Sequence, residues 1–340
     1  MSGKGSAKPA ARNFDKELAA LEELAKSFHA GTALSGEAQE QLRMALGNRN
    51  NLLVAKAAKL VEEGELVSLL PEVLAAYDRF FADAVKSDPQ CWAKNALARA
   101  MAKLEHRTKD AYVRGLRHHQ MEPVWGGISD TAGALRCACA NALVNCPGVS
   151  DADLLTIFLD PLLDSDKTVR IEATRAIANV GGVGAALILR LRAMIGPKID
   201  KDEPEVLGAC YSSLLALEGE QAIPLVAAAM KEGDELAGEA AFALADLRTA
   251  PALAALLERL KAGTDEWFRQ ILLSAIAVTR QPRAIDFLLG LIESEAREAT
   301  MAIEAIGRSG PSAELRSRVE EAVRQVGSPR LLKVLAEHLG

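Results

Sequence analysis

The sequence predicts an all-α protein, and three observations carry that prediction. Hydrophobic residues make up 49% of the 340 residues but aromatic residues only 4%, so the apolar content is mostly Ala and Leu, which favour helices. One helical spacing of apolar residues recurs along most of the chain. Small residues hold fixed places within that spacing, so neighbouring helices can approach closely. Together these observations predict an α-solenoid of about eight to nine stacked helical hairpins.

The repeated pattern is one face of a helix. Starting from Val169, apolar or small side chains follow at steps of four, seven, eight and eleven residues, at Ala173, Ala176, Ile177 and Val180. That spacing places them on one side of an α-helix. The same template recurs about every 35 residues on average. Its other starting residues are Leu53, Ala93, Leu135, Val206, Leu236, Phe268, Glu295 and Leu331.

A second set of helices is expected between the template helices. Leucine-rich segments of similar length separate successive copies, so each repeat is predicted to be a hairpin. We call the helix that carries the template the second helix of its repeat, and the helix before it the first helix. The clearest first helices cover residues 66–81, 183–195, 249–263 and 282–294.

Two second helices carry an acidic and a basic residue at a fixed separation. Asp166 lies four residues before Arg170, and Asp265 lies four residues before Arg269. In these features the chain, from about residue 37 to its end, resembles the HEAT-repeat proteins. The resemblance implies a right-handed superhelix whose second helices line a concave surface. It also implies that the arginines pair with these acids or with acids of the neighbouring repeat, rather than contact phosphate.

The position after the first residue of the template is basic in only some repeats. The copies that begin at Val206 and Leu236 lack a basic residue there, so the pattern is interrupted in the middle of the chain. The repeats that have one carry Lys94, Arg136, Arg170 and Arg269.

Charge and cysteine usage restrict the environment and the partners. The formal net charge is −6, which disfavours nucleic acid and anionic membranes as partners. The five cysteines are odd in number and no hydrophobic signal segment precedes them, so we expect reduced thiols and a cytoplasmic protein. The apolar runs are short, so no membrane span is expected. Residues 1–12 predict a disordered basic tail, and residues 13–340 a single domain.

No pattern of residues points to chemistry. Cys139, Cys146 and Cys210 fall on template positions where a small core side chain is expected. The chain lacks paired Cys or His spacings suited to zinc, a nucleophile elbow and a phosphate-binding loop. We therefore expect no metal, no cofactor and no catalytic residue.

The segment 118–130 has a composition unlike the rest of the chain. Pro123 and the pair Gly126-Gly127 exclude a helix, so we expect a loop inserted between the two helices of one repeat. Trp125 within it has two possible roles. It either packs back on the core or is presented to a ligand.

Two histidines open this segment. His118 and His119 are expected to end the preceding helix, where cations interact favourably with its C-terminal carbonyls. The alternative is that one of them is a general base supported by Glu122 or Asp130.

The candidate binding surface is the side of the second helices that faces away from the shared core. Steps of two, five, six and nine residues from the start of the template point to that side, and many of these positions are apolar. Such a row predicts a groove for an amphipathic helix or an extended peptide. The competing interpretation buries the row between neighbouring hairpins. The predicted partner-binding residues are Ile171, Arg175, Tyr211, Leu215, Phe242, Leu273 and Met301, together with Trp125.

These observations favour a cytoplasmic scaffold that binds a protein or peptide on its concave surface without catalysis. Two alternatives stay open: an enzyme or enzyme accessory with a site in segment 118–130, and a HEAT-like nucleic-acid binder. The sequence names neither the partner nor the oligomeric state.

Overall fold

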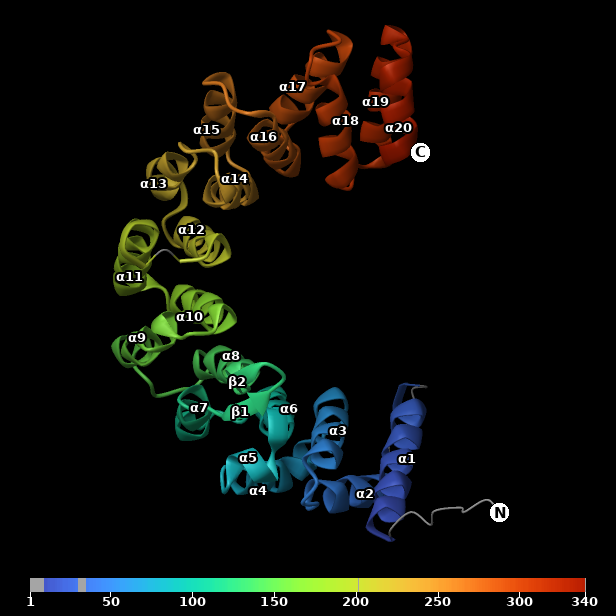
Figure 1. Cartoon of the computed structure of the whole chain (residues 1–340), viewed down its shortest axis with the longest axis vertical. Coiled ribbons are helices and arrows are strands. Elements are labelled where there is room, and N and C mark those ends of the chain that lie inside the picture. The colour runs from blue at the N-terminus through green and yellow to red at the C-terminus, as the bar shows by residue number, and fades with distance from the viewer. Residues whose placement is uncertain (1–8, 30–34, 201, 340) are drawn as a thin grey trace. The chain divides into compact units, whose positions relative to one another are not determined.

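The computed structural model describes residues 9–29, 35–200 and 202–339, and these residues are helical along most of their length (Figure 1). The all-α prediction is confirmed. The chain divides into two compact units, residues 1–176 and 177–340, and the boundary lies inside helix α10. We describe each unit by itself.

In unit 1 the second helices lie side by side, and the first helices pack against them. Helix α3 contacts α6, α6 contacts α8, and the first helices α4 and α7 contact α6 and α8 (Figure 1). The second helices are α3 (Asn51–Glu63), α6 (Trp92–Lys103), α8 (Gly133–Leu143) and α10 (Lys167–Val180); the others are α1 (Pro9–His29), α2 (Gly36–Leu46), α4 (Leu70–Arg79), α5 (Ala84–Ser87), α7 (Lys109–Leu116) and α9 (Asp151–Leu159).

Helix α1 begins inside the segment that the sequence assigns to a disordered tail. Residues 9–12 are helical, so the prediction is wrong for them. Residues 1–8 of the predicted tail lie outside the described residues.

Unit 2 repeats the arrangement. Helix α12 contacts α14, α14 contacts α16, α16 contacts α18, and α18 contacts α20. The second helices are α12 (Pro204–Glu218), α14 (Glu235–Leu247), α16 (Glu266–Val278), α18 (Ala299–Arg308) and α20 (Pro329–Leu339); the first helices are α11 (Gly182–Ile195), α13 (Ile223–Ala229), α15 (Ala250–Lys261), α17 (Pro282–Glu293) and α19 (Ala313–Val326).

The template residues form the core of these helices. In α16, Phe268, Leu272, Ala275 and Ile276 are all 0% exposed. The carboxylate of Asp265 accepts a hydrogen bond of 2.8 Å from the backbone N–H of Phe268 and so caps the helix N-terminus. Burial of one face and a capped first turn explain why the helix forms at this place.

The template copy that starts at Glu295 has the predicted register, but its first residue lies outside the helix. Glu295 is exposed in a turn with a φ of 47°. Helix α18 begins at Ala299, and the residues at steps four, seven, eight and eleven from Glu295 are all buried: Ala299, Ala302, Ile303 and Ile306. The first residue can be polar here because the chain has not yet entered the helix.

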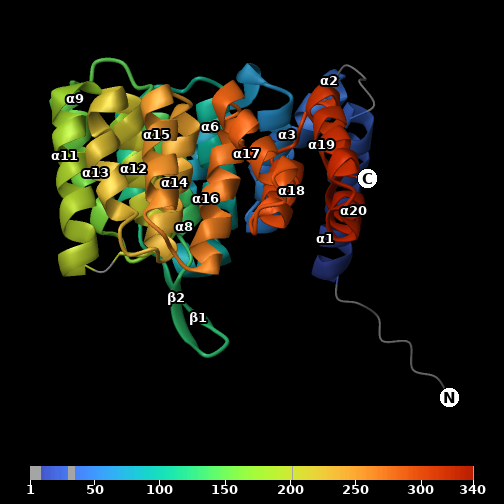
Figure 2. The ribbon, with the colours of Figure 1, turned by 90° about the horizontal axis from the view of Figure 1, so that it is seen from above.

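Segment 118–130 forms a β-hairpin, not an irregular loop. Strand β1 (Met121–Val124) pairs antiparallel with β2 (Gly127–Asp130), with Met121 opposite Asp130. The two-residue turn ends at Gly126, whose φ of 94° is one that glycine adopts without strain. The hairpin projects past the ends of the unit 1 helices (Figure 2).

Candidate partner-binding surface

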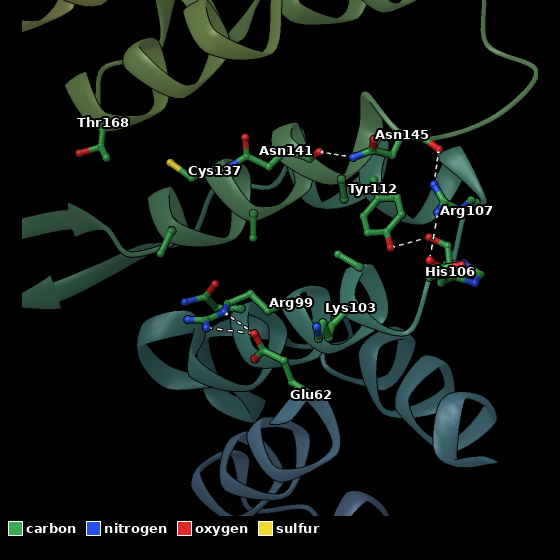
Figure 3. Close-up of a pocket in the computed structure, with 16 residues that line it drawn as sticks. Glu62, Arg99, Lys103, His106, Arg107, Tyr112, Cys137, Asn141, Asn145 and Thr168 are labelled. Atoms are coloured by element: carbon green, nitrogen blue, oxygen red, sulfur yellow. Dashed lines mark hydrogen bonds and ion pairs between the residues drawn. The ribbon is translucent and has the colours of Figure 1, made fainter. Parts of the chain in front are cut away.

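A hollow of about 880 Å³ opens on the second helices of unit 1 (Figure 3). Side chains of α3, α6 and α8 line it, and Thr168 of α10 closes one side. We call it the second-helix hollow. Its polar lining includes Glu62, Arg99, Lys103, Asn141 and Asn145.

The cations of the hollow are held by contacts that cross from one repeat to the next. The Arg99 guanidinium of α6 lies 3.0 Å from the Glu62 carboxylate of α3. The Lys103 ammonium lies 2.7 Å from the carboxylate of Glu65. These side chains are partly exposed, so each pair stabilises the fold by less than about 1 kcal/mol. Their main effect is to fix the direction in which the charges face.

Amide side chains of α8 and of the residues after it also line the hollow. Asn141 donates a hydrogen bond of 3.1 Å to the carboxylate of Glu172, and Asn145 donates one of 3.4 Å to the Asn141 carbonyl. An amide side chain donates through nitrogen and accepts through oxygen, so it matches both groups of a peptide main chain. The lining of the hollow therefore suits a polypeptide segment.

Burial favours the neutral form of two titratable groups of the hollow, His106 and Cys137. Burial lowers the pKa of His106, which is thus neutral at pH 7. Burial, and then the charge of Glu172, raises the pKa of the Cys137 thiol to about 12. A thiol that stays protonated at neutral pH is a weak nucleophile.

The apolar row predicted on the second helices does not form an exposed groove. Tyr211 and Leu215 are each 2% exposed, and Leu273 is 0% exposed. Of the other predicted residues, Phe242 is 37% exposed. Ile171 and Met301 are half-buried, and Arg175 is exposed and pairs with Glu172.

The predicted row is buried because second helices within one unit pack against each other, as α3, α6 and α8 do in unit 1 and α12, α14 and α16 do in unit 2. The residue at the fifth step from the template start is buried in every repeat from α6 to α16. The sixth step is the exposed one, and in unit 1 it is polar, at Arg99 and Asn141. Arg99 and Asn141 were not among the predicted residues. The sign that could have found them is that in these two repeats a small apolar residue at step five, Ala98 or Ala140, is followed by a polar residue at step six. The buried fifth-step residues are Ala98, Ala140, Thr174, Tyr211, Ala241 and Leu273.

The histidines at the base of the hairpin do not cap helix α7. The His118 ring packs edge-on against Phe81 at 5.0 Å between centroids and lies 3.1 Å from the Gln120 side-chain oxygen. Burial lowers the pKa of His118, so it is not the cation expected there. His119 Nδ1 lies 2.7 Å from the Asp130 carboxylate.

Asp130 is held by donors on every side. Its carboxylate accepts hydrogen bonds of 3.0 Å from the backbone N–H groups of Gln120 and Ala132, and lies 2.8 Å from Arg136. Burial acts to raise the pKa of Asp130, but these donors, with His119, more than offset it and hold the pKa well below its usual range. The Asp130–Arg136 contact thus fastens the hairpin to α8, and the His119–Asp130 contact joins the two ends of the hairpin.

Arg136 joins two repeats from inside the protein. It is 1% exposed, and its guanidinium lies against Asp130 and makes two contacts, of 2.8 and 3.0 Å, with Asp164. Two parallel contacts fix the orientation of both groups. Asp164 lies just before α10, so Arg136 connects α8 to the start of the next second helix.

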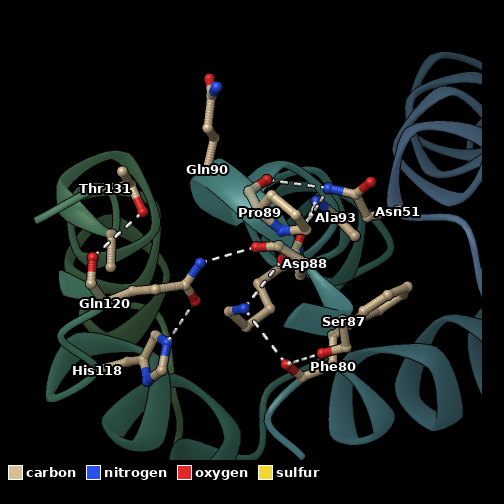
Figure 4. Close-up of polar contacts among 12 residues, drawn as sticks. Asn51, Phe80, Ser87, Asp88, Pro89, Gln90, Ala93, His118, Gln120 and Thr131 are labelled. Carbon is tan, nitrogen blue, oxygen red and sulfur yellow. Dashed lines mark hydrogen bonds and ion pairs between the residues drawn. The ribbon is translucent and has the colours of Figure 1, made fainter. Parts of the chain in front are cut away.

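A second buried network holds the other side of the hairpin (Figure 4). Asp88 and Lys94 are each 0% exposed, and their charged groups lie 3.0 Å apart. The Asp88 carboxylate also accepts the backbone N–H groups of Ala93 and Lys94 at the start of α6. Gln120 donates a hydrogen bond of 2.7 Å to the Asp88 carbonyl, so the chain before β1 is bound to the start of α6.

Glu122 of β1 completes the attachment. Both oxygens of its carboxylate accept the backbone N–H of Gln90 at 2.9 Å. Glu122 is 6% exposed, and the groups suggested for a general base are thus engaged in holding the hairpin. The tip is different, because Trp125 is 104% exposed. It does not pack on the core, which was one of its two predicted roles.

Two of the template cysteines lie in the core. Cys139 is 0% exposed and Cys146 is 5% exposed. Across residues 9–29, 35–200 and 202–339, no three His, Cys, Asp or Glu side chains are grouped so that they could hold a metal ion. None of the helices in these ranges is long and apolar enough to cross a bilayer.

Comparison with known proteins adds little to this description. No protein-family model and no curated protein matches the chain. A crystal structure of an engineered protein from the Northeast Structural Genomics Consortium is similar over 98% of this chain and 96% of its own, with 15% sequence identity and a TM-score of 0.39. A similarity of that size supports no conclusion about function.

Proposed function

We propose that the protein is a HEAT-type α-solenoid scaffold that binds an extended peptide segment of a protein partner on the second-helix surface of unit 1. The second-helix hollow carries this proposal. In the HEAT resemblance, the surface formed by the second helices is the concave one of a right-handed superhelix. The proposed occupant is a segment without regular structure, whose main chain needs donors and acceptors.

The lining supports a peptide better than it supports a small molecule. The hollow is open along α6 and α8, and its polar groups are spread over three repeats. Guanidinium groups donate, carboxylates accept and the asparagine amides do both. A chain that runs across the repeats would meet these groups in succession, as extended peptides do on other repeat surfaces.

A selection from a phage-displayed library of random linear peptides tests the proposal. We expect linear peptides to be selected by the purified protein and to bind with affinities that fluorescence polarisation can measure. Asn141→Trp fills the hollow and Arg99→Glu reverses a charge in it, so each should weaken binding by at least about tenfold, or 1.4 kcal/mol.

Glu258→Lys is the matched control, because Glu258 is an exposed charge on the first helix α15. It should bind the selected peptides as the unaltered protein does. A library that gives no binder, or peptides that bind Asn141→Trp as tightly as the unaltered protein, would contradict the proposal.

A further inference from the structure

Helix α11 of unit 2 presents an exposed apolar ridge. Val183 is 77% exposed, Leu187 61%, Leu191 59% and Met194 51%. These residues are spaced by four, four and three positions, so they follow one face of the helix for nearly its full length. Large apolar side chains aligned in this way are rare on the surface of a monomer and mark an interaction site.

The ridge is uncharged, and the other first helices of unit 2 do not all share this character. Helix α17 exposes Arg283 and Asp286. The two arginines of α11 form ion pairs within unit 2. Arg190 pairs with Glu218, and Arg192 pairs with Asp202. The exposed residues of α11 are Gly182, Val183, Gly184, Leu187, Leu191 and Met194.

A shelf of small residues lies beside the ridge. Helix α13 follows α11 in the row of first helices and exposes Pro224 and Ala228 (Figures 1 and 2). The next helix, α15, contacts α13 and exposes Pro251 and Ala254. From α11 to residues 224–228 of α13 and 250–254 of α15 the surface therefore changes from bulky to small uncharged side chains, and the exposed charge of Glu258 follows one turn further along α15.

We propose that this face binds a second copy of the same chain. In a dimer with a twofold axis, the ridge of each copy lies on the shelf of the other. The interface therefore contains two equivalent contacts, in each of which the bulky side chains of α11 face the small residues of α13. Phosphate or an acidic peptide would need cations, and the ridge presents none among the exposed residues of α11.

The area required also favours ridge on shelf over ridge on ridge. An apolar patch of this kind offers about 300–600 Å². A stable complex buries about 800 Å² on each partner. The ridge alone falls short of this area, and the shelf adds further apolar surface to each partner's side of the contact.

Sedimentation equilibrium over about 1–200 μM protein tests the dimer, since this range brackets a micromolar Kd. The unaltered full chain is expected to reach twice the monomer mass within the range. Leu187→Glu places a charge in the ridge and should return the mass to that of the monomer. Leu187 is exposed, so the variant should keep the circular dichroism spectrum of the unaltered protein.

Ala228→Glu distinguishes the proposed arrangement, because it alters the shelf and leaves the ridge intact. It should weaken the dimer as Leu187→Glu does, by at least about tenfold in Kd. Leu332→Glu is the control, since Leu332 is a similarly exposed leucine, 42%, on α20. A monomer at every concentration would overturn the dimer, and a dimer insensitive to Ala228→Glu would overturn the ridge-on-shelf contact. Neither result bears on peptide binding by unit 1.

Discussion

The two units solve the same packing problem with different chemistry. In three repeats of unit 1 the residue after the first template position is a buried cation, at Lys94, Arg136 and Arg170, and Lys94 pairs with the buried Asp88. In unit 2 the same position holds an apolar side chain in two repeats, Leu207 at 1% and Ala237 at 0% exposure. The same helix packing accommodates an apolar side chain or a cation at this buried position, provided that the cation has an acidic partner.

The difference follows from the segment that enters each helix. Asp88 lies six residues before Lys94, and Asp130 lies six residues before Arg136. In unit 2 the residue six positions before Ala237 is a lysine. A buried charge costs several kcal/mol unless its partner is present, so in these repeats of unit 1 the buried acid and the buried base occur together.

The largest effect is expected where this pair is broken. Asp88→Ala leaves the Lys94 ammonium buried without its carboxylate and removes the acceptor for two N–H groups of α6. We expect a loss of about 3–5 kcal/mol in the free energy of unfolding, measured by urea denaturation.

Arg318→Ala provides the comparison, because Arg318 forms an exposed ion pair with Asp286. Its cost should stay below about 1 kcal/mol. If Asp88→Ala costs no more than Arg318→Ala, the buried pair does not hold unit 1 together.

A smaller effect, and one that depends on pH, is expected at Asp130. Because its pKa is lowered in the folded protein, its stabilisation is fully present above the unfolded-state pKa of about 4 and is lost as the pH falls through the folded pKa. Asp130→Asn should therefore cost about 1–3 kcal/mol at pH 7.

The difference between the unaltered protein and Asp130→Asn should shrink as the pH is lowered below about 4. Urea denaturation of both proteins at a series of pH values measures it. A difference that is the same at pH 7 and at acid pH would show that the carboxylate charge contributes nothing.

The smallest effect is expected at the hairpin tip. Trp125 makes no buried contact at 104% exposure, so Trp125→Ser should change the free energy of unfolding by less than about 0.5 kcal/mol. Thermal unfolding of Trp125→Ser and of Asp88→Ala, each compared with the unaltered protein, measures this difference between the tip and the base of the hairpin. A marked loss of stability in Trp125→Ser would mean that the tip packs against the protein.

Much of the fold could be predicted from the sequence because core positions repeat with the period of a helix. The template residues Phe268 and Leu272 are buried as the spacing requires. The hairpin could not be predicted, since Pro123 and Gly126 exclude a helix without specifying strands. The exposed face was misjudged because the burial of Tyr211 depends on a neighbouring helix that is distant in the sequence.

The sequence by itself determined that the chain is helical, where most second helices begin and which of their faces is buried. Local periodicity and capping residues decide these features, and both can be recognised within the sequence of a single helix. Only the tertiary structure decided which outward positions stay exposed, that Asp130 and Asp164 meet on Arg136, and that α11 is left uncovered. These features depend on side chains from separate repeats coming into contact, and spacing within one helix carries no information about the helix beside it.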